Sequence, residues 1–100
     1  MAYHSTAQSI AGSSITASYT LAASAPNKDS IVSCVLTGNL DEDVWISFDG
    51  TNDHYFLQSG GNNLAFNGDR SVNHSQNVYV KHAGVQPAAD KKLVITYIGR

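Results

Sequence analysis

Residues 44–57 read Val44-Trp45-Ile46-Ser47-Phe48-Asp49-Gly50-Thr51-Asn52-Asp53-His54-Tyr55-Phe56-Leu57, and this stretch decides the fold. Its first part alternates apolar residues with Trp45 and Ser47, the period of two that is typical of a half-buried strand. Asp49-Gly50 supplies turn chemistry, because Gly tolerates positive φ and the Asp carboxylate accepts hydrogen bonds from nearby amides. A second β-prone run follows from His54 to Leu57. The stretch therefore predicts a β-hairpin that holds the chain's largest cluster of aromatic residues.

The composition indicates one domain with a weakly charged surface. The chain has 100 residues, of which 42% are hydrophobic and 14% charged, and its formal net charge is −2. The chain has no excess of basic residues of the kind that nucleic-acid-binding proteins carry, so we expect no nucleic-acid partner. No apolar run is long enough for a membrane helix, and the N-terminus has neither the basic start nor the apolar core of a signal peptide.

The first 25 residues are low in complexity, since Ala, Ser and Thr make up sixteen of them and no charged residue precedes Lys28. Such a composition is typical of a flexible arm. From Ile15 to Leu21, however, apolar and polar residues alternate as in a strand. We therefore predict an N-terminal arm over residues 1–13 and a sandwich domain over residues 14–100, with a first strand at 14–21. Our preferred interpretation docks the arm on another subunit, and the alternative folds it back on its own domain.

Further strand-like runs follow at residues 30–37, 64–66, 77–81 and 93–98. The last run is apolar on both faces, which places it at the centre of a sandwich or in a subunit contact. No segment has the 3.6-residue repeat of an amphipathic helix. The pattern predicts an all-β fold, a single β-sandwich that is jelly-roll-like or, as second choice, immunoglobulin-like. Cys34, the only cysteine, has apolar neighbours and is predicted to be a buried thiol.

Motifs for metal binding and catalysis are missing from the sequence. The hairpin loop places oxygen ligands at alternate positions, but the sixth and twelfth residues from Asp49 are His54 and Gly60, where a calcium-binding EF-hand needs Gly and Glu. The four histidines do not have metal-ligand spacing. We therefore expect no metal, no cofactor and no enzymatic activity.

Two aromatic residues in predicted strands, Trp45 and Tyr79, stand next to polar residues. Exposed rings of this kind form stacking platforms for sugars in many sandwich domains. The sequence therefore keeps a carbohydrate-binding module as an alternative function. The other interpretation of both rings is that they fill the core or a subunit contact.

The hairpin, together with Asn77-Val78-Tyr79-Val80-Lys81 and the terminal strand from Leu93 to Ile98, resembles small β-sandwich virion proteins of tailed bacteriophages. The resemblance covers about residues 30–98 and favours a head decoration (cement) protein, with a head–tail junction or tail protein as alternative. It implies a virion location, the major capsid protein or other virion subunits as partners, and a homo-oligomer, with a trimer favoured. The residues expected in partner contacts are Tyr3, His4, Ile10 and Ile15 for the lattice and Ile31, Ile95 and Tyr97 for self-association.

Overall fold

The computed structural model describes residues 4–24, 31–59, 62–67 and 77–99. These residues form eight strands, and the only helical segment among them is the short 3₁₀ turn η1 (Gly12–Ser14). In chain order the strands are β1 (His4–Ala11), β2 (Thr20–Ala23), β3 (Ile31–Gly38), β4 (Val44–Ser47), β5 (Tyr55–Leu57), β6 (Asn62–Asn67), β7 (Val78–His82) and β8 (Lys92–Gly99).

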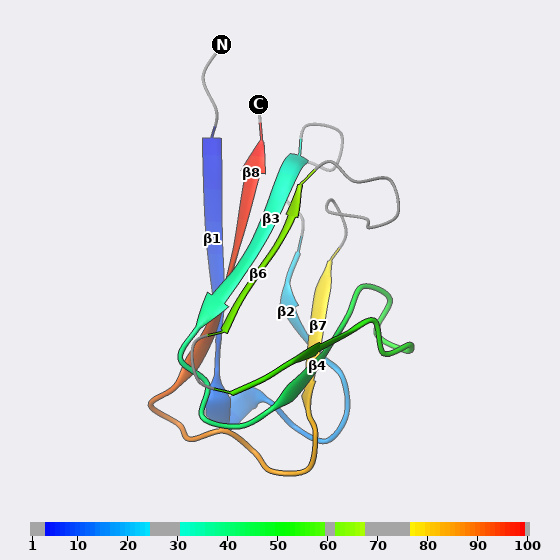
Figure 1. The fold of residues 1–100 in the computed structure, drawn as a ribbon, viewed down its shortest axis with the longest axis vertical. Helices are drawn as coiled ribbons and strands as arrows, with labels where there is room; N and C mark the ends of the chain where they lie inside the picture. The colour runs from blue at the N-terminus through cyan, green and yellow to red at the C-terminus, as the bar shows by residue number, and fades with distance from the viewer. Residues whose placement is uncertain (1–3, 25–30, 60–61, 68–76, 100) are drawn as a thin grey trace.

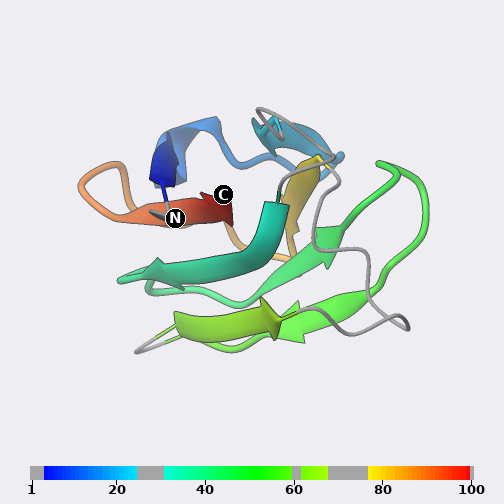
Figure 2. The ribbon, with the colours of Figure 1, turned by 90° about the horizontal axis from the view of Figure 1, so that it is seen from above.

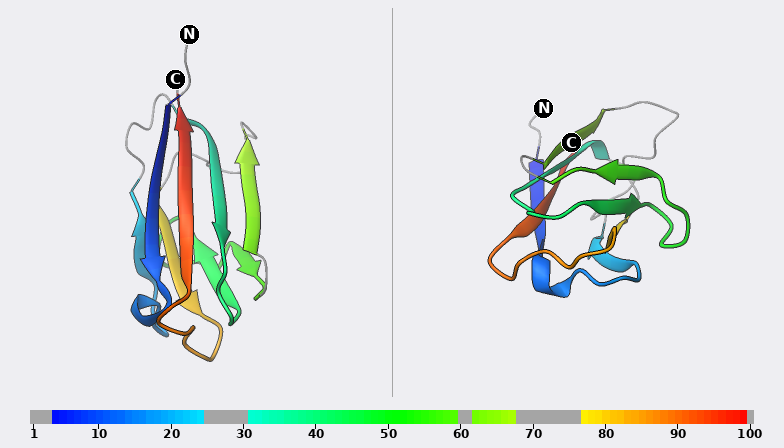
Figure 3. Two further views of the ribbon diagram at one scale, coloured as in Figure 1. Left: turned by 90° about the vertical axis from the view of Figure 1, so that its left-hand side faces the viewer. Right: turned by 60° about the horizontal axis from the view of Figure 1, so that its bottom comes forward.

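The strands build two antiparallel sheets, one with the order β1-β8-β3-β6 and one with the order β2-β7-β4-β5 (Figure 1; Figure 2). The left view of Figure 3 shows β1, β8 and β3 running side by side along the molecule. One cluster of buried apolar side chains, contributed by strands of both sheets, forms the core. The prediction of an all-β fold is confirmed, and the arrangement is that of a β-sandwich.

Strand β8 shows how the period of two creates this core. Leu93, Ile95 and Tyr97 are almost completely buried, with at most 1% of their surface exposed. The residues between them are half-buried on the opposite face of the sheet. β8 lies between β1 and β3, so the strand that is apolar on both faces is a central strand of its sheet.

The predicted hairpin is also present. Strands β4 and β5 pair antiparallel, with Val44 opposite Leu57, Trp45 opposite Phe56 and Ile46 opposite Tyr55. Val44 and Ile46 are completely buried, whereas Trp45 between them is only partly covered. The alternation read from the sequence therefore assigns Val44, Ile46 and Trp45 correctly, whereas Ser47, which it places on the face of Trp45, is completely buried.

The N-terminal segment differs from the prediction. His4–Ala11 is not an arm outside the sandwich but strand β1, which pairs along its whole length with β8, from His4 opposite Gly99 to Ala11 opposite Lys92. The physical reason is that β8 supplies hydrogen-bond partners for the backbone, while Ile10 is buried in the core. The alternative interpretation, in which this segment folds back on its own domain, describes the structure.

The strand expected at residues 14–21 is also displaced. Residues 12–14 form η1 and the strand begins only at Thr20, although Ile15 is buried as its apolar character suggests. Gly12 permits this turn, because a Cβ atom at that position would lie 2.2 Å from the carbonyl oxygen of Ala88. The amide of Gly12 also donates to the carbonyl of Lys91 at 2.8 Å. A close approach of two backbones thus ends β1 and turns the chain toward the second sheet.

Candidate interaction surfaces

The loop between β4 and β5 is held in shape by the side chains of Ser47 and Asp49. The carboxylate of Asp49 accepts hydrogen bonds from the amides of Thr51 and Asn52 at 2.8 and 2.9 Å and from the side-chain amide of Asn52 at 2.7 Å. The hydroxyl of Ser47 donates to the same carboxylate at 2.8 Å and accepts from the amide of Gly50 at 2.9 Å. These bonds, first among them the one from the Asn52 amide, hold the pKa of Asp49 well below its usual range.

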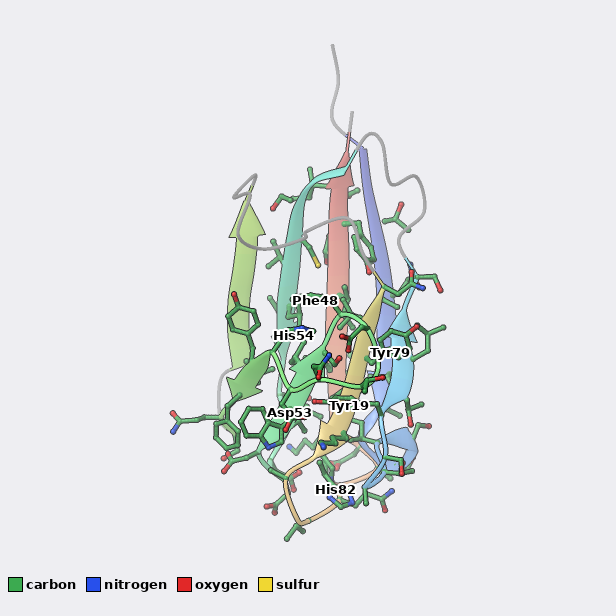
Figure 4. The ribbon with its side chains drawn as sticks, turned by 90° about the vertical axis from the view of Figure 1, so that its right-hand side faces the viewer. Tyr19, Phe48, Asp53, His54, Tyr79 and His82 are labelled. Atoms are coloured by element: carbon green, nitrogen blue, oxygen red, sulfur yellow. The ribbon has the colours of Figure 1, made fainter. Side chains whose placement is uncertain are left out.

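The same loop folds back over strand β7, as Figure 4 shows. Gly50, with φ of +78°, lies against the ring of Tyr79, since a Cβ atom there would be 3.4 Å from two carbons of the ring. The imidazole of His54 accepts a hydrogen bond from the amide of Phe48 at 3.0 Å and stacks on the Phe48 ring. The ring of Tyr79 therefore supports the loop, and this ring, one of the two considered for sugar stacking, is partly covered by the backbone of Gly50.

Three side chains from separate parts of the chain meet beside this loop. The hydroxyl of Tyr19 donates to Oδ1 of Asp53, and Nζ of Lys81 lies 3.3 Å from the same oxygen. The ammonium group of Lys81 also lies over the Tyr19 ring, 4.7 Å from its centroid. Figure 4 labels Tyr19 and Asp53 in this arrangement.

The contacts within this group shift two pKa values in opposite directions. Desolvation, together with the hydrogen bond to Asp53, raises the pKa of Tyr19 well above its usual range. The hydrogen bond from Tyr19, assisted by Lys81, lowers the pKa of Asp53. At neutral pH Tyr19 is therefore a neutral phenol and Asp53 a carboxylate.

Next to this group lies an exposed aromatic pair. The rings of Trp45 and Phe56 are 5.0 Å apart between centroids and inclined by 68°. Phe56 is opposite Trp45 across β5 and β4, and Trp45 is opposite Lys81 across β4 and β7, so the three side chains share the outer face of the sheet. We call this line of side chains, Phe56, Trp45, Lys81 and Tyr19, the aromatic row.

Sequence reasoning identified Trp45 but missed Phe56 and Tyr19. A signal for Phe56 was present, because in a hairpin with Val44 opposite Leu57 the residue facing Trp45 is Phe56. No local signal exists for Tyr19, whose partner Asp53 lies 34 residues away.

The outer face of the other sheet has a different character. Strands β1, β3, β6 and β8 contain a single Lys, Arg, Asp or Glu, which is Lys92 at the start of β8. Directly paired residues of neighbouring strands point to the same face, so the pairing defines which side chains are outside. We call this surface the uncharged face, and its described members are Ser5, Ala7 and Ser9 of β1, Val94, Thr96 and Ile98 of β8, and Val35 and Thr37 of β3.

Most of the residues predicted to contact partners do not lie on either surface. Ile10, Ile15, Ile95 and Tyr97 are buried in the core, with at most 8% of their surface exposed. They were expected outside because an apolar residue in a strand fits a core and an interface equally well, and only the pairing of the sheets distinguishes the two.

The three remaining predicted contact residues are at or beyond the ends of described strands. His4 and Ile31 begin β1 and β3, where each backbone pairs with Gly99, while their side chains are outside the description. Tyr3 lies outside the described residues.

The fold defines a β-sandwich with two contrasting outer faces. No protein-family model matches the chain, and comparisons with curated proteins and with solved structures give no significant match. Within the described ranges, no three His, Cys, Asp or Glu residues gather where a metal ion could be held. That part of the chain also has no helix with the length and apolar character needed to cross a membrane.

Proposed function

We propose that this protein is a structural component of a bacteriophage virion, a decoration or cement protein that binds an assembled capsid. The observation that carries the proposal is the uncharged face. Exposed surfaces of soluble domains usually contain many charged residues. Apart from Lys92 at the start of β8, this face presents small polar and aliphatic side chains along β1, β3 and β8. A protein surface can dock there without leaving a charge buried and unpaired.

The topology supports the same class of protein. The strand orders β1-β8-β3-β6 and β2-β7-β4-β5 are those of two interleaved Greek keys, which we interpret as a jelly roll rather than an immunoglobulin-like sandwich. Jelly rolls are frequent in viral capsid proteins, so the topology favours a virion role by analogy of fold alone.

The proposed mechanism is stabilisation by mass action. A protein that binds the assembled shell and not its separated subunits adds its binding free energy to the stability of the shell. An oligomer of this chain, with a trimer favoured, engages several lattice sites at once and reaches high avidity through individually weak contacts. The partner is the major capsid protein or another virion subunit.

Co-sedimentation of the labelled protein with capsid shells that lack it, from the virus whose genome encodes the chain, tests the proposal. Two variants place a charge on exposed positions of the uncharged face, Ser9→Lys and Thr37→Lys. The matched control, Val85→Lys, adds the same charge to a loop residue that is 59% exposed. We expect the native protein and the control to sediment with the shells and both face variants to stay in the supernatant. Absence of binding by the native protein, or equal binding by all variants, would overturn the proposal.

A further inference from the structure

The geometry points to a binding site for neutral oligosaccharides at the aromatic row, on the sheet opposite to the uncharged face. Three features lead to this assignment: exposed rings, a hydrogen-bonding pair fixed beside them, and the local charge. The site goes beyond the proposed function, because it uses other strands and another face.

The rings provide the apolar part of the site. Phe56 is 44% exposed, and Trp45 beside it is partly exposed. Because the two rings are inclined by 68°, they form a corner rather than a flat stack. A pyranose ring has apolar faces made of C–H groups, which pack on an aromatic face, and a corner contacts both a face and an edge of the sugar.

The ion pair provides the polar part. Nζ of Lys81 has three hydrogens, of which the contact with Asp53 uses only part, and the carboxylate of Asp53 has about four lone-pair positions. Neighbouring hydroxyls of a sugar need one donor and one acceptor close together, and the two atoms at 3.3 Å supply both. The bond from Tyr19 holds Asp53 in position, so this pair is ordered before any ligand arrives.

The charge selects the class of ligand. The charged groups that act on Tyr19 in the row are one cation, Lys81, and two carboxylates, Asp53 and Asp49, so the local balance is negative. A nucleic acid, a phosphorylated ligand or a sialylated or sulfated glycan would be repelled. A standard protein–protein interface covers about 800 Å² on each partner, whereas the row is a single line of side chains. A neutral oligosaccharide chain fits a narrow row that crosses three strands.

The test begins with an array of immobilised neutral, sialylated and sulfated glycans, probed with the labelled full-length protein. Neutral glycans that bind are then titrated in solution by fluorescence. Trp45 is the only tryptophan of the chain, so the signal arises inside the proposed site. We expect binding to neutral glycans and a change in Trp45 emission on saturation.

Three variants assign the interaction to the row. Phe56→Ala removes the partner ring and should weaken binding about tenfold, the loss expected for one aromatic contact. Lys81→Gln keeps a hydrogen-bond donor on a polar side chain without the charge and should also weaken binding, while circular dichroism reports an intact fold. Val85→Ala, at an exposed apolar residue of a loop, is the control and should bind like the native protein.

Three results would overturn the assignment. One is the absence of binding to any glycan on the array. Another is binding restricted to charged glycans. The third is equal affinity of Phe56→Ala, Lys81→Gln and the control. Because capsid co-sedimentation is measured with variants of the opposite sheet, failure of this site and failure of the virion proposal are distinguishable.

Discussion

The hydroxyl of Tyr19 donates a hydrogen bond to Asp53, 34 residues further along the chain. The bond joins the segment before β2 to the loop between β4 and β5, and it places the carboxylate beside Lys81. Because of this contact, the conformation of the loop and the arrangement of the side chains in the aromatic row depend on each other.

Removing the Tyr19 hydroxyl should change the titration of Asp53. In Tyr19→Phe the carboxylate loses the largest of the interactions that lower its pKa, so this pKa should rise toward the ordinary value of an aspartate. An NMR titration that follows the side-chain carboxyl carbon of Asp53 measures this change in pKa. Lys81→Gln should also raise this pKa, because the hydrogen bond and the charge of Lys81 both lower it. An unchanged pKa of Asp53 in Tyr19→Phe would show that the hydrogen bond does not form in solution.

The loop carboxylate Asp49 should make stability depend on pH in the acid range. Its folded-state pKa lies below the unfolded value of about 3.9, so its stabilising effect is fully present above that pH and is lost as the pH falls further. The difference in unfolding free energy between the native protein and Asp49→Asn should therefore be constant between about pH 5 and 8 and shrink below pH 4. Urea unfolding at several pH values measures it. A difference that stays constant into the acid range contradicts this assignment.

Two glycines should respond differently to replacement by alanine. In Gly12→Ala the new Cβ atom meets a backbone oxygen at 2.2 Å, so the chain must move, at a cost of about 1–3 kcal/mol or more. In Gly84→Ala nothing lies within 4 Å, and the loss of stability comes only from the positive φ of 140°, which glycine adopts readily and other residues do not. Denaturant unfolding should rank Gly12→Ala as the more destabilised protein. The reverse order would mean that the approach of η1 to Ala88 is looser than described.

The thiol of Cys34 should be inert in the folded protein. The side chain is 1% exposed, and burial raises its pKa to about 12, so almost no thiolate exists at pH 8. A thiol reagent such as Ellman's should react only at the rate of unfolding and completely in denaturant. Rapid reaction of the native protein at pH 8 would contradict the buried position.

Several features of the fold were predictable because they depend on neighbouring residues. The alternation along β4 identifies its buried face, and the apolar neighbours of Cys34 indicate that its thiol is inside. The strand β1 was not predictable in this way, since its Ser, Thr and Ala residues have no apolar repeat and its partner β8 lies at the other end of the chain. Only the completed sheet shows that Ile10 is a core residue.

The candidate surfaces also divide into features that depend on neighbouring residues and features that depend on distant ones. The outward position of Trp45 could be read from its strand, whereas the cover over Tyr79 depends on the direction in which the loop folds after Gly50. No spacing in the sequence encodes that direction. The uncharged face likewise becomes visible only when β1, β8 and β3 are placed side by side.

The last prediction concerns strand β1 and tests whether this segment is a docking arm or a part of the sandwich. If the segment is a strand of the domain, Ile10→Ala should destabilise the isolated protein by about 2–4 kcal/mol, as truncation of a buried Ile does. Ser9→Ala is the matched control, since Ser9 is exposed and next in the chain, and it should change stability by less than about 0.5 kcal/mol.

Urea unfolding of the isolated protein measures both variants. An arm that only docks on neighbours would give equal stabilities, since its side chains would contribute nothing to the free domain. Deleting residues 2–12 extends the test, because β8 would become an edge strand and the core would lose Ile10. We expect that deletion to abolish cooperative unfolding, since a domain of this size has only about 5–15 kcal/mol of stability to lose. A deletion variant that folds with native stability would show that residues 2–12 are an arm and that β1 is not part of the sandwich.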